Sequence, residues 1–331
     1  MIITRTPFRI SFFGGGTDYP AWSSEHGGAV LATSIDKYCY ISCRKLPPFF
    51  DHKHRIVYSS IENVKHNDEI KHPAVRALFA RMRIKDGLEI HHDGDLPARS
   101  GLGSSSSFTV GMLHALHALS GQMCSKKQLA SDAIHIEQHI IGEHVGSQDQ
   151  ISAAFGGFNR ITFHRSGTFE VSPVILSSRR YQILNKHLML FFTGFSRIAS
   201  EIAQSQIANI KTHTNELKQM HRMVDQAIDI LQDEKTHIAA FGELLHQNWN
   251  YKRTLSPRIS TSEVDTIYDQ ARQAGAIGGK LLGAGGGGFM LLFAVPEKQA
   301  EIRHQLNHLI QVPFNFEDSG SQTVLYQPNG L

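Results

Sequence analysis

The sequence predicts an α+β protein built in two halves. Its first 60 residues read as strands separated by glycine- and proline-rich turns, at Ile2–Phe13, Val30–Cys43 and Arg55–Ser60. Helical spacing of apolar residues becomes frequent after residue 104, and a glycine-rich run over Gly275–Gly288 leads into an apolar strand. A length of 331 residues, at about 150 residues per domain, agrees with two domains.

The individual elements follow from apolar spacing, capping residues and turns. A pattern that includes Phe108, Met112 and Leu116 predicts a helix between Gly103 and Gly121. The other expected elements, in order, are a helix at Pro73–Arg83, a strand at Leu88–His92, a helix opened by the capping box Ser125–Gln128, strands on either side of Arg165–Gly167, a buried strand at Leu188–Phe192, helices at Leu217–Leu231 and Glu263–Ala274, a strand at Phe289–Val295 and a helix at Glu297–Ile310.

A boundary between the halves is expected near a charged stretch, SSRRYQ, at residues 177–182. It separates the strand-rich part of the chain from a helix-rich part that begins with the apolar strand Leu188–Phe192. The sequence therefore predicts an N-terminal domain over residues 1–178 and a C-terminal domain over residues 179–331.

Composition and charge exclude several classes of partner. The chain has 33 Lys and Arg against 30 Asp and Glu, a net charge of +3 that gives no reason to expect nucleic acid. The longest clean apolar run, Phe289–Val295, is far too short to cross a membrane, and the N-terminus lacks the apolar stretch of a signal peptide. Three cysteines without a CxxC motif do not form a disulfide framework. A cytoplasmic protein with small-molecule partners is expected.

One glycine cluster, Gly283–Gly288, matches the GxGxxG pattern of dinucleotide-binding proteins. That pattern requires a strand before it and a helix after it, whereas here a strand follows directly. The Walker A pattern is also absent, because Gly279-Lys280 is followed by Leu281. A Rossmann oxidoreductase remains an alternative that a test of NAD binding would decide.

A second cluster, Asp95-Leu-Pro-Ala-Arg-Ser-Gly-Leu-Gly-Ser-Ser-Ser-Ser107, combines two glycines with four serines at the start of a helix. Backbone N–H groups at a helix N-terminus attract anions, and glycines let a phosphate approach the backbone closely. Serine hydroxyls add hydrogen-bond donors and an oxygen ligand for Mg²⁺. Phosphate binding and an ordinary serine-rich helix cap are about equally supported by these residues alone.

Two acidic residues follow this cluster. Glu137 has Ile134, Ile140 and Ile141 at helical spacing, which places a carboxylate against an apolar face. Asp149 follows a glycine-containing turn, where it could face a cleft. Spacing alone favours an ordinary helix with one misplaced glutamate, followed by a loop aspartate. The 20 histidines are scattered and do not form HExxH, so solvated or core histidines are favoured over a zinc site.

Three motifs, taken together, resemble the GHMP small-molecule kinases, the family of galactokinase and of homoserine, mevalonate and phosphomevalonate kinases. They are Thr6–Tyr19 (TPFRISFFGGGTDY), Pro97–Ser107 with GLGSS, and Lys280–Gly288 (KLLGAGGGG). They occur in the family's order and span nearly the whole chain. The resemblance implies an N-terminal domain like ribosomal protein S5 domain 2, a ferredoxin-like C-terminal domain and an active site between them.

The resemblance also implies a role for particular residues. ATP and Mg²⁺ would be bound, with Asp149 as the catalytic acid-base group and Arg9 stabilising the transferring charge. The phosphates would lie on Gly101, Leu102, Gly103, Ser104, Ser105 and Ser106, and the metal on Ser105 and Glu137. The acceptor would contact Gly15, Gly16, Thr17, Asp18, Arg99, Arg197 and Gly285.

Galactokinases carry Glu-His where this chain has Gly15-Gly16, and the motif versions found here resemble the heptose kinase branch of the family instead. That branch implies phosphorylation of the anomeric C1 hydroxyl of D-glycero-D-manno-heptose 7-phosphate to the 1,7-bisphosphate, for nucleotide-activated heptose and surface glycans. A substrate phosphate would need basic partners, for which Arg99, Arg197, Lys252 and Arg253 are candidates. Another sugar 1-kinase, acting on fucose or galactose, and a non-catalytic sugar and ATP sensor remain alternatives. A homodimer is also compatible with the resemblance.

Overall fold

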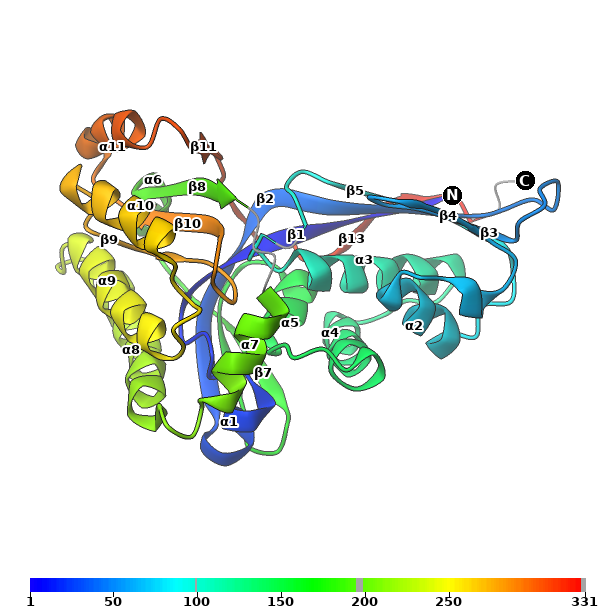
Figure 1. Ribbon diagram of the computed structural model, residues 1–331, viewed down its shortest axis with the longest axis horizontal. Coiled ribbons are helices and arrows are strands. Elements are labelled where there is room, and N and C mark those ends of the chain that lie inside the picture. The colour runs from blue at the N-terminus through cyan, green and yellow to red at the C-terminus, as the bar shows by residue number, and fades with distance from the viewer. Residues whose placement is uncertain (99, 195–198, 329–331) are drawn as a thin grey trace.

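Two β-sheets with helices packed against them form the protein in the computed structural model, which describes residues 1–98, 100–194 and 199–328 (Figure 1). The strands of the first sheet are β1 (Ile2–Phe13), β2 (Gly28–Lys45), β3 (His54–Val57), β4 (Ile61–Val64), β5 (Leu88–Gly94), β6 (Phe158–Phe163), β7 (Phe169–Pro173), β12 (Phe316–Glu317) and β13 (Gln322–Tyr326). The strands of the second sheet are β8 (Leu188–Gly194), β9 (Gly278–Leu281), β10 (Gly288–Phe293) and β11 (Ile310–Gln311).

The long strands β1 and β2 hold the first sheet together. Its main path runs β13-β1-β2-β5-β3-β4, while β12 and β6 also pair with β2, and β7 pairs with β6. The pairings are antiparallel except that of β3 with β5. The last eight residues of β1 are all buried, because this end of the strand passes into the core between the two halves. The first motif thus begins on a strand that pairs with β2 along its length, next to the residues Ile2–Arg5 that also pair with β13.

Helices cover one face of the first sheet (Figure 1). The longest of them packs on β1 and β2 through a largely apolar surface, as its helical pattern predicts, and Ser107 donates to the Pro7 carbonyl of β1. The helices and helical turns of this half are α1 (Pro20–His26), the 3₁₀ turn η1 (Asn67–Glu69), α2 (Pro73–Arg81), α3 (Ser104–Leu119), α4 (Lys126–His135), the π-helix η2 (Ile136–Ile141) and α5 (Gln148–Phe155).

The second sheet has the order β11-β8-β10-β9 and is antiparallel throughout. All six residues of β10 are buried, as expected for an apolar strand at the centre of a sheet. The helices and helical turns of this half are α6 (Ser178–Lys186), α7 (Ala199–Ala208), α8 (Thr214–Gln232), α9 (Ala239–Thr254), α10 (Ser262–Gln273), the 3₁₀ turn η3 (Pro296–Lys298) and α11 (Gln299–Gln305).

The α+β class predicted from the sequence is confirmed. The charged stretch at 177–182, near which a domain boundary was predicted, forms the start of α6, whose first turn is capped by the Ser177 hydroxyl accepting from the Arg180 amide at 3.1 Å. Arg180 is buried, and its guanidinium donates to the carbonyl oxygens of Ile230 and Thr236. An arginine can be placed inside a protein when its N–H groups find such acceptors.

The end of the chain returns to the first sheet. Strand β12 pairs with β2 and β13 pairs with β1, so residues 316–326 hydrogen-bond with strands of the N-terminal half. The division into residues 1–178 and 179–331 stays a prediction, and the sheets themselves divide the chain differently at its C-terminus.

Two predicted helices have different ends in the structure. The helix expected over 297–310 ends at Gln305 and is preceded by a separate 3₁₀ turn. The helix that opens after Ser125 changes at Ile136 into the π-helix η2, which Gly142 ends in a left-handed conformation. π-helices are rare and are found frequently at functional sites.

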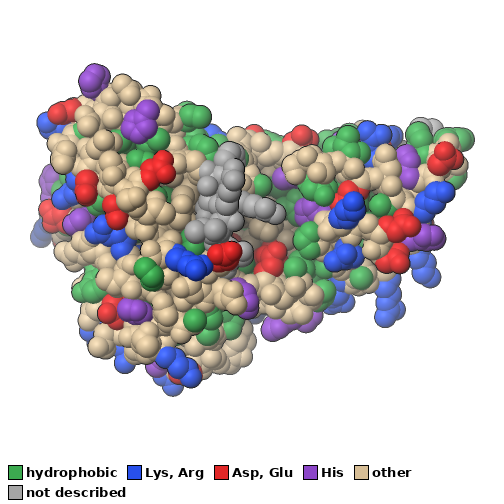
Figure 2. Space-filling model, viewed as in Figure 1, with side chains coloured by type: hydrophobic (Ala, Val, Ile, Leu, Met, Phe, Trp, Pro, Cys, Tyr) green, Lys and Arg blue, Asp and Glu red, His purple; other side chains and the backbone are tan. Residues whose placement is uncertain are grey.

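Basic and acidic side chains are interspersed on the face of the molecule shown in Figure 2. Among the residues that the structure describes, no helix combines the length and the apolar character needed to span a membrane.

Candidate active site

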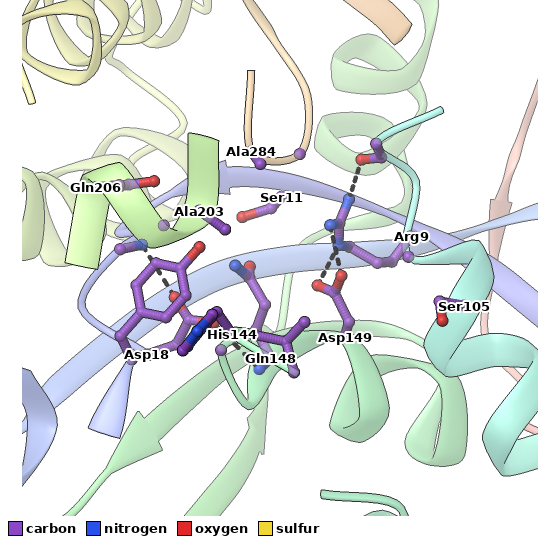
Figure 3. A pocket seen from close by; sticks show the side chains of 18 of the residues that line it. Arg9, Ser11, Asp18, Ser105, His144, Gln148, Asp149, Ala203, Gln206 and Ala284 are labelled. Carbon is purple, nitrogen blue, oxygen red and sulfur yellow. Dashed lines mark hydrogen bonds and ion pairs between the residues drawn. The ribbon is translucent and has the colours of Figure 1, made fainter. Parts of the chain in front are cut away.

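A cavity of about 560 Å³ lies where the two halves meet (Figure 3). The N-terminal half contributes the end of β1, the turn that follows it, the N-terminus of α3 and the segment 142–149. The C-terminal half contributes α7, α9, β9 and the loop after β9. The three motifs are far apart in the sequence but meet at this cavity.

An arginine–aspartate pair lies in the cavity wall. Arg9 on β1 donates from Nε to Asp149 Oδ1 at 2.7 Å and from Nη2 to Asp149 Oδ2 at 2.9 Å, and it also donates from Nη1 to the Gly101 carbonyl at 2.7 Å (Figure 3). Arg9 is 4% exposed, whereas Asp149, in the first turn of α5, is 27% exposed. The two-point contact fixes both side chains, while two of the five arginine N–H groups and part of the carboxylate remain available to a ligand.

Two glycine-rich loops touch each other beside this pair. Gly101 has φ +85° and a Cβ there would lie 2.5 Å from the Leu282 carbonyl oxygen, while a Cβ on Gly283, at φ +76°, would lie 2.4 Å from Gly101 Cα. Gly103 is the N-cap of α3 and is also left-handed, at φ +76°. Only glycine fits this packing. The loops therefore hold the N-terminus of α3, with its anion-attracting amides, at the edge of the cavity.

The turn after β1 places a second carboxylate in the cavity. Asp18 is buried and accepts from the Gly16 amide at 2.9 Å and from the Gln148 amide at 3.3 Å. Burial raises the pKa of Asp18, the nearby Asp149 charge adds to the rise, and the two backbone amides oppose it. Gly146 packs on this carboxyl so closely that a Cβ there would lie 1.8 Å from Asp18 Oδ2.

Glu137 lies in the π-helix η2, behind the first turn of α3. It is 1% exposed, and its Oε2 accepts from Ser106 Oγ at 2.8 Å and from the side-chain Nε2 of Gln150. Its other oxygen, Oε1, is buried and has no hydrogen-bond partner in the part of the chain that the structure describes. Burial raises the pKa of Glu137 to about 7, and the side chains of Thr109, Ser106 and Gln150 oppose the rise.

Two lysines from the C-terminal half complete the cavity wall. Lys252 on α9 donates to the carbonyl oxygens of Gly283 and Leu281, and Lys280 on β9 donates to the Phe12 carbonyl at 3.0 Å. Burial lowers the pKa of Lys252 to about 8 and that of Lys280 well below its usual range, and the positive charge of Arg9 adds to both effects.

The structure brings most of the predicted site residues together. Those that line the cavity are Arg9, Gly15, Gly16, Asp18, Gly101, Gly103, Ser104, Ser105 and Asp149. Five do not line it: Leu102, Ser106, Thr17, Gly285 and Glu137. Arg99 and Arg197, predicted to contact the substrate, lie outside the described residues.

The residues off the cavity have other contacts. The Thr17 hydroxyl donates to the Gly14 and Ala29 carbonyls, and it therefore holds the turn after β1. The carbonyl of Leu102 accepts from the Arg9 amide at 3.0 Å. Gly285, at φ +127°, packs against the backbone of Ile259. Each supports the wall from behind, so their predicted contacts with ligands stay predictions.

Several residues of the cavity wall were not predicted as part of the site. They are Ser11, Tyr19, Gln148, Lys280, Ala203, Gln206, Gly283, Ala284 and the loop residues Gly142, Glu143, His144, Val145 and Gly146. Lys280 stands in the third motif and could have been found there. The residues of α7 carry no motif, and only the tertiary structure brings them to the cavity.

Oxygen donors that could take part in holding a metal ion lie beside the first turn of α3. No group of three or more His, Cys, Asp or Glu side chains suitable for a metal occurs within the part of the chain that the structure describes. The serine hydroxyls of α3 and the unpartnered Glu137 Oε1 are oxygen donors that suit Mg²⁺, which binds proteins through one or two carboxylates together with phosphate oxygens. Ser106 donates a hydrogen bond to Glu137, and the predicted role of Ser105 as a metal ligand stays a prediction.

Comparison with known proteins relates the whole chain to one family. Residues 68–157 match the model for the GHMP kinases N terminal domain, and residues 234–310 match that for GHMP kinases C terminal. A D-glycero-alpha-D-manno-heptose 7-phosphate kinase of Campylobacter jejuni is 30% identical over 311 residues, which cover 90% of this chain and 91% of that protein. A bifunctional fucokinase/GDP-fucose pyrophosphorylase of Arabidopsis thaliana is 26% identical over 91% of this chain, which matches 30% of that longer protein.

Solved structures share the fold over nearly the full chain. A D-glycero-D-manno-heptose 1-phosphate kinase from Bacteroides thetaiotaomicron has a TM-score of 0.80 at 22% identity, with 98% of each chain covered. Lactococcus lactis galactokinase complexed with galactose has a TM-score of 0.75 at 17% identity, with 98% of this chain and 95% of that chain covered. The fold with N- and C-terminal domains that the resemblance implied is thereby confirmed. The chain belongs to the GHMP kinase family and is an ATP-dependent phosphotransferase.

Proposed function

We propose that the protein transfers the γ-phosphoryl group of MgATP to the anomeric C1 hydroxyl of D-glycero-D-manno-heptose 7-phosphate. The observation that carries the transfer chemistry is the Arg9–Asp149 pair beside the N-terminus of α3, within one cavity. The heptose acceptor is supported by the 30% identity with the Campylobacter jejuni kinase over 90% of this chain. It is also supported by Gly15 and Gly16, where galactokinases carry Glu-His.

In the proposed reaction the acceptor oxygen attacks the γ-phosphorus, the bond to the β–γ bridging oxygen breaks, and ADP leaves. Asp149 accepts or orients the hydroxyl proton, which requires a carboxylate that faces the cavity. Arg9 holds that carboxylate and directs its two remaining N–H groups toward the transferring group. Catalysis of phosphoryl transfer rests mainly on such positioning and charge stabilisation.

Glu137 and the first-turn hydroxyls of α3 are the proposed holders of Mg²⁺, with Ser105 as predicted and Ser106 already in contact with Glu137. When bound, the cation would neutralise charge on the β- and γ-phosphate oxygens. The buried, unpartnered Oε1 of Glu137 supports this role, because a carboxylate oxygen without a donor is costly unless a ligand or ion completes it.

The Mg²⁺ requirement is expected to depend on pH through Glu137. With the pKa of Glu137 near 7, the carboxylate that binds the cation is mostly ionised at pH 8 and mostly protonated at pH 6. The half-saturating Mg²⁺ concentration should therefore rise about tenfold between pH 8 and pH 6. Steady-state assays at saturating ATP, with free Mg²⁺ varied at each pH, measure it. The control is Glu137→Gln. In this variant the rise in half-saturating Mg²⁺ concentration that is due to Glu137 must vanish, and only the pH dependence caused by titration of ATP remains.

Gly146 is expected to control the position of Asp18, the proposed ligand of an acceptor hydroxyl. Gly146→Ala places a methyl group where Asp18 Oδ2 now lies, so the carboxyl must move. KM for the acceptor should rise about tenfold, because small displacements of positioning groups are costly, while KM for ATP stays unchanged. Gly167→Ala, in an open turn between β6 and β7 at φ +80°, is the control for a glycine replacement away from the cavity. An unchanged acceptor KM would remove Asp18 from the acceptor site.

ATP consumption across free sugars and sugar phosphates tests the proposal directly. The panel contains heptose 7-phosphate, the unphosphorylated heptose, fucose, galactose and mevalonate, with the product position identified by phosphorus NMR. We expect the highest kcat/KM with heptose 7-phosphate and a product phosphorylated at C1. The similarity to fucokinase makes fucose the second candidate acceptor. No turnover with any acceptor, together with tight ATP binding, would favour the sensor alternative.

A further inference from the structure

Lys252 and Lys280 are two buried ammonium groups in one cavity without an acidic partner. Lys252 is 5% exposed and Lys280 is 1% exposed. Their hydrogen bonds go to main-chain carbonyl oxygens, of Leu281 and Gly283 for Lys252 and of Phe12 for Lys280. Within residues 1–98, 100–194 and 199–328, no carboxylate lies within ion-pair distance of either nitrogen.

Each ammonium group retains donors after these contacts. An ammonium has three N–H groups, so at least one remains on Lys252 and two remain on Lys280. Burying a cation is costly unless an anion compensates it, and carbonyl oxygens supply hydrogen bonds but no negative charge. Asp18 and Asp149 line the same cavity and attract Lys252, but only from beyond ion-pair distance. Both lysines line the cavity, so an anionic ligand there could supply the missing charge.

Ser11 is an independent sign of a ligand on the same wall. It lies on β1 directly before Phe12, whose carbonyl accepts from Lys280, and it is 5% exposed. Its hydroxyl is buried and has no hydrogen-bond partner among the described residues, although it lines the cavity (Figure 3). A buried hydroxyl without a partner is uncommon in a folded protein, and here a bound group could complete it.

We propose that Lys252, Lys280 and Ser11 form a phosphate subsite, separate from the Gly101–Ser106 loop. Two cations and a hydroxyl match the charge and the acceptor oxygens of a phosphate group. This proposal rests on the proposed function, because the phosphate in the subsite would be either the phosphate of the acceptor or the γ-phosphate of ATP. Both sources share the same chemistry at the subsite.

Binding of inorganic phosphate to the full-length protein tests the subsite without any turnover. Titration calorimetry is performed with MgADP saturating, so that the nucleotide already occupies its own site. Wild-type protein should bind phosphate, and Lys252→Met and Lys280→Met should each weaken binding by about tenfold, as expected for loss of a charged hydrogen bond. Lys298→Met, which removes the exposed partner of Glu301, is the matched control and should bind like wild type.

Two more conservative substitutions test the subsite even if the methionine variants unfold. Ser11→Ala removes only the unpartnered hydroxyl and should weaken phosphate binding by about threefold. Lys280→Arg keeps the charge and should retain more phosphate binding than Lys280→Met. Melting temperatures of all variants separate loss of the subsite from loss of the fold.

A second titration, with a non-hydrolysable ATP analogue in place of ADP, distinguishes the two sources. Phosphate binding that persists assigns the subsite to the acceptor's own phosphate, whereas binding that is lost assigns it to the γ-phosphoryl group. The proposal is overturned if wild-type protein does not bind phosphate, or if Ser11→Ala and the folded lysine variants bind it like wild type. The acceptor assays test the proposed function separately. If heptose 7-phosphate is turned over but phosphate binding does not depend on the lysines, only the subsite is refuted. If phosphate binding depends on the lysines but heptose 7-phosphate is not turned over, only the proposed acceptor is refuted.

Discussion

Replacing Asp149 with Asn is expected to lower kcat by about 10³-fold, the scale of a lost acid-base group. Asn cannot accept the acceptor's proton, but its side-chain oxygen can still take one hydrogen bond from Arg9, which now makes two to the carboxylate. The affinity for ATP should stay within about twofold, because the Gly101–Ser106 loop is unchanged. Rapid-quench measurement of the first turnover, together with nucleotide titration, gives both values.

The control for this change is Asp225→Asn. Asp225 pairs with Arg160 at 3.0 Å on the surface, so the substitution removes the same charge from an arginine pair outside the cavity. It should leave kcat unchanged. Asp149→Asn also weakens the ion pair of the buried Arg9, so its melting temperature must be compared with that of wild type. A folded Asp149→Asn protein with near-wild-type kcat would show that Asp149 is not the catalytic acid-base group.

Glu137→Gln is expected to raise the half-saturating Mg²⁺ concentration by about 10–100-fold, since changes to groups around a bound metal commonly have effects of this size. The amide keeps the size of the side chain but removes the negative charge. Because burial already raises the pKa of Glu137 to about 7, the neutral amide should not destabilise the metal-free protein. Its melting temperature without Mg²⁺ should equal or exceed that of wild type at pH 8, where the wild-type carboxyl carries a buried charge.

Glu62→Gln is the matched control, because Glu62 is also a buried glutamate but accepts from the amides of Lys71 and His72, far along the sheet from the cavity. Hydrogen bonds with these amides and Tyr58 outweigh the effect of burial and lower the pKa of Glu62, so its loss should reduce stability and leave the Mg²⁺ requirement unchanged. The metal role of Glu137 is refuted if Glu137→Gln needs no more Mg²⁺ than wild type.

The sequence predicted those helices and strands that are marked by a pattern among neighbouring residues. The apolar alternation of β1, the helical pattern of α3 and the apolar run of β10 each identify an element that the structure contains. Four helices near the cavity, α1, α5, α7 and α9, were not predicted. The first three are only 7, 8 and 10 residues long, and α9 buries the polar side chains of Asn248 and Lys252 among its apolar ones, which obscures its helical pattern. The pairing of β13 with β1 joins residues more than 300 positions apart, and no short-range pattern indicates it.

The α+β class and, through three ordered motifs, the resemblance to the GHMP kinases could be inferred without the structure. The glycine- and serine-rich motifs could be recognised because these residues act through local backbone geometry. Gly101 and Gly103 are left-handed, and the helix that follows begins at Ser104. The tertiary structure alone decided which side chains meet. Arg9 contacts Asp149 across 140 residues, Ser106 contacts Glu137, and Lys280 contacts the Phe12 carbonyl across 268 residues. Such contacts depend on how two sheets pack, and the packing is a property of the whole chain.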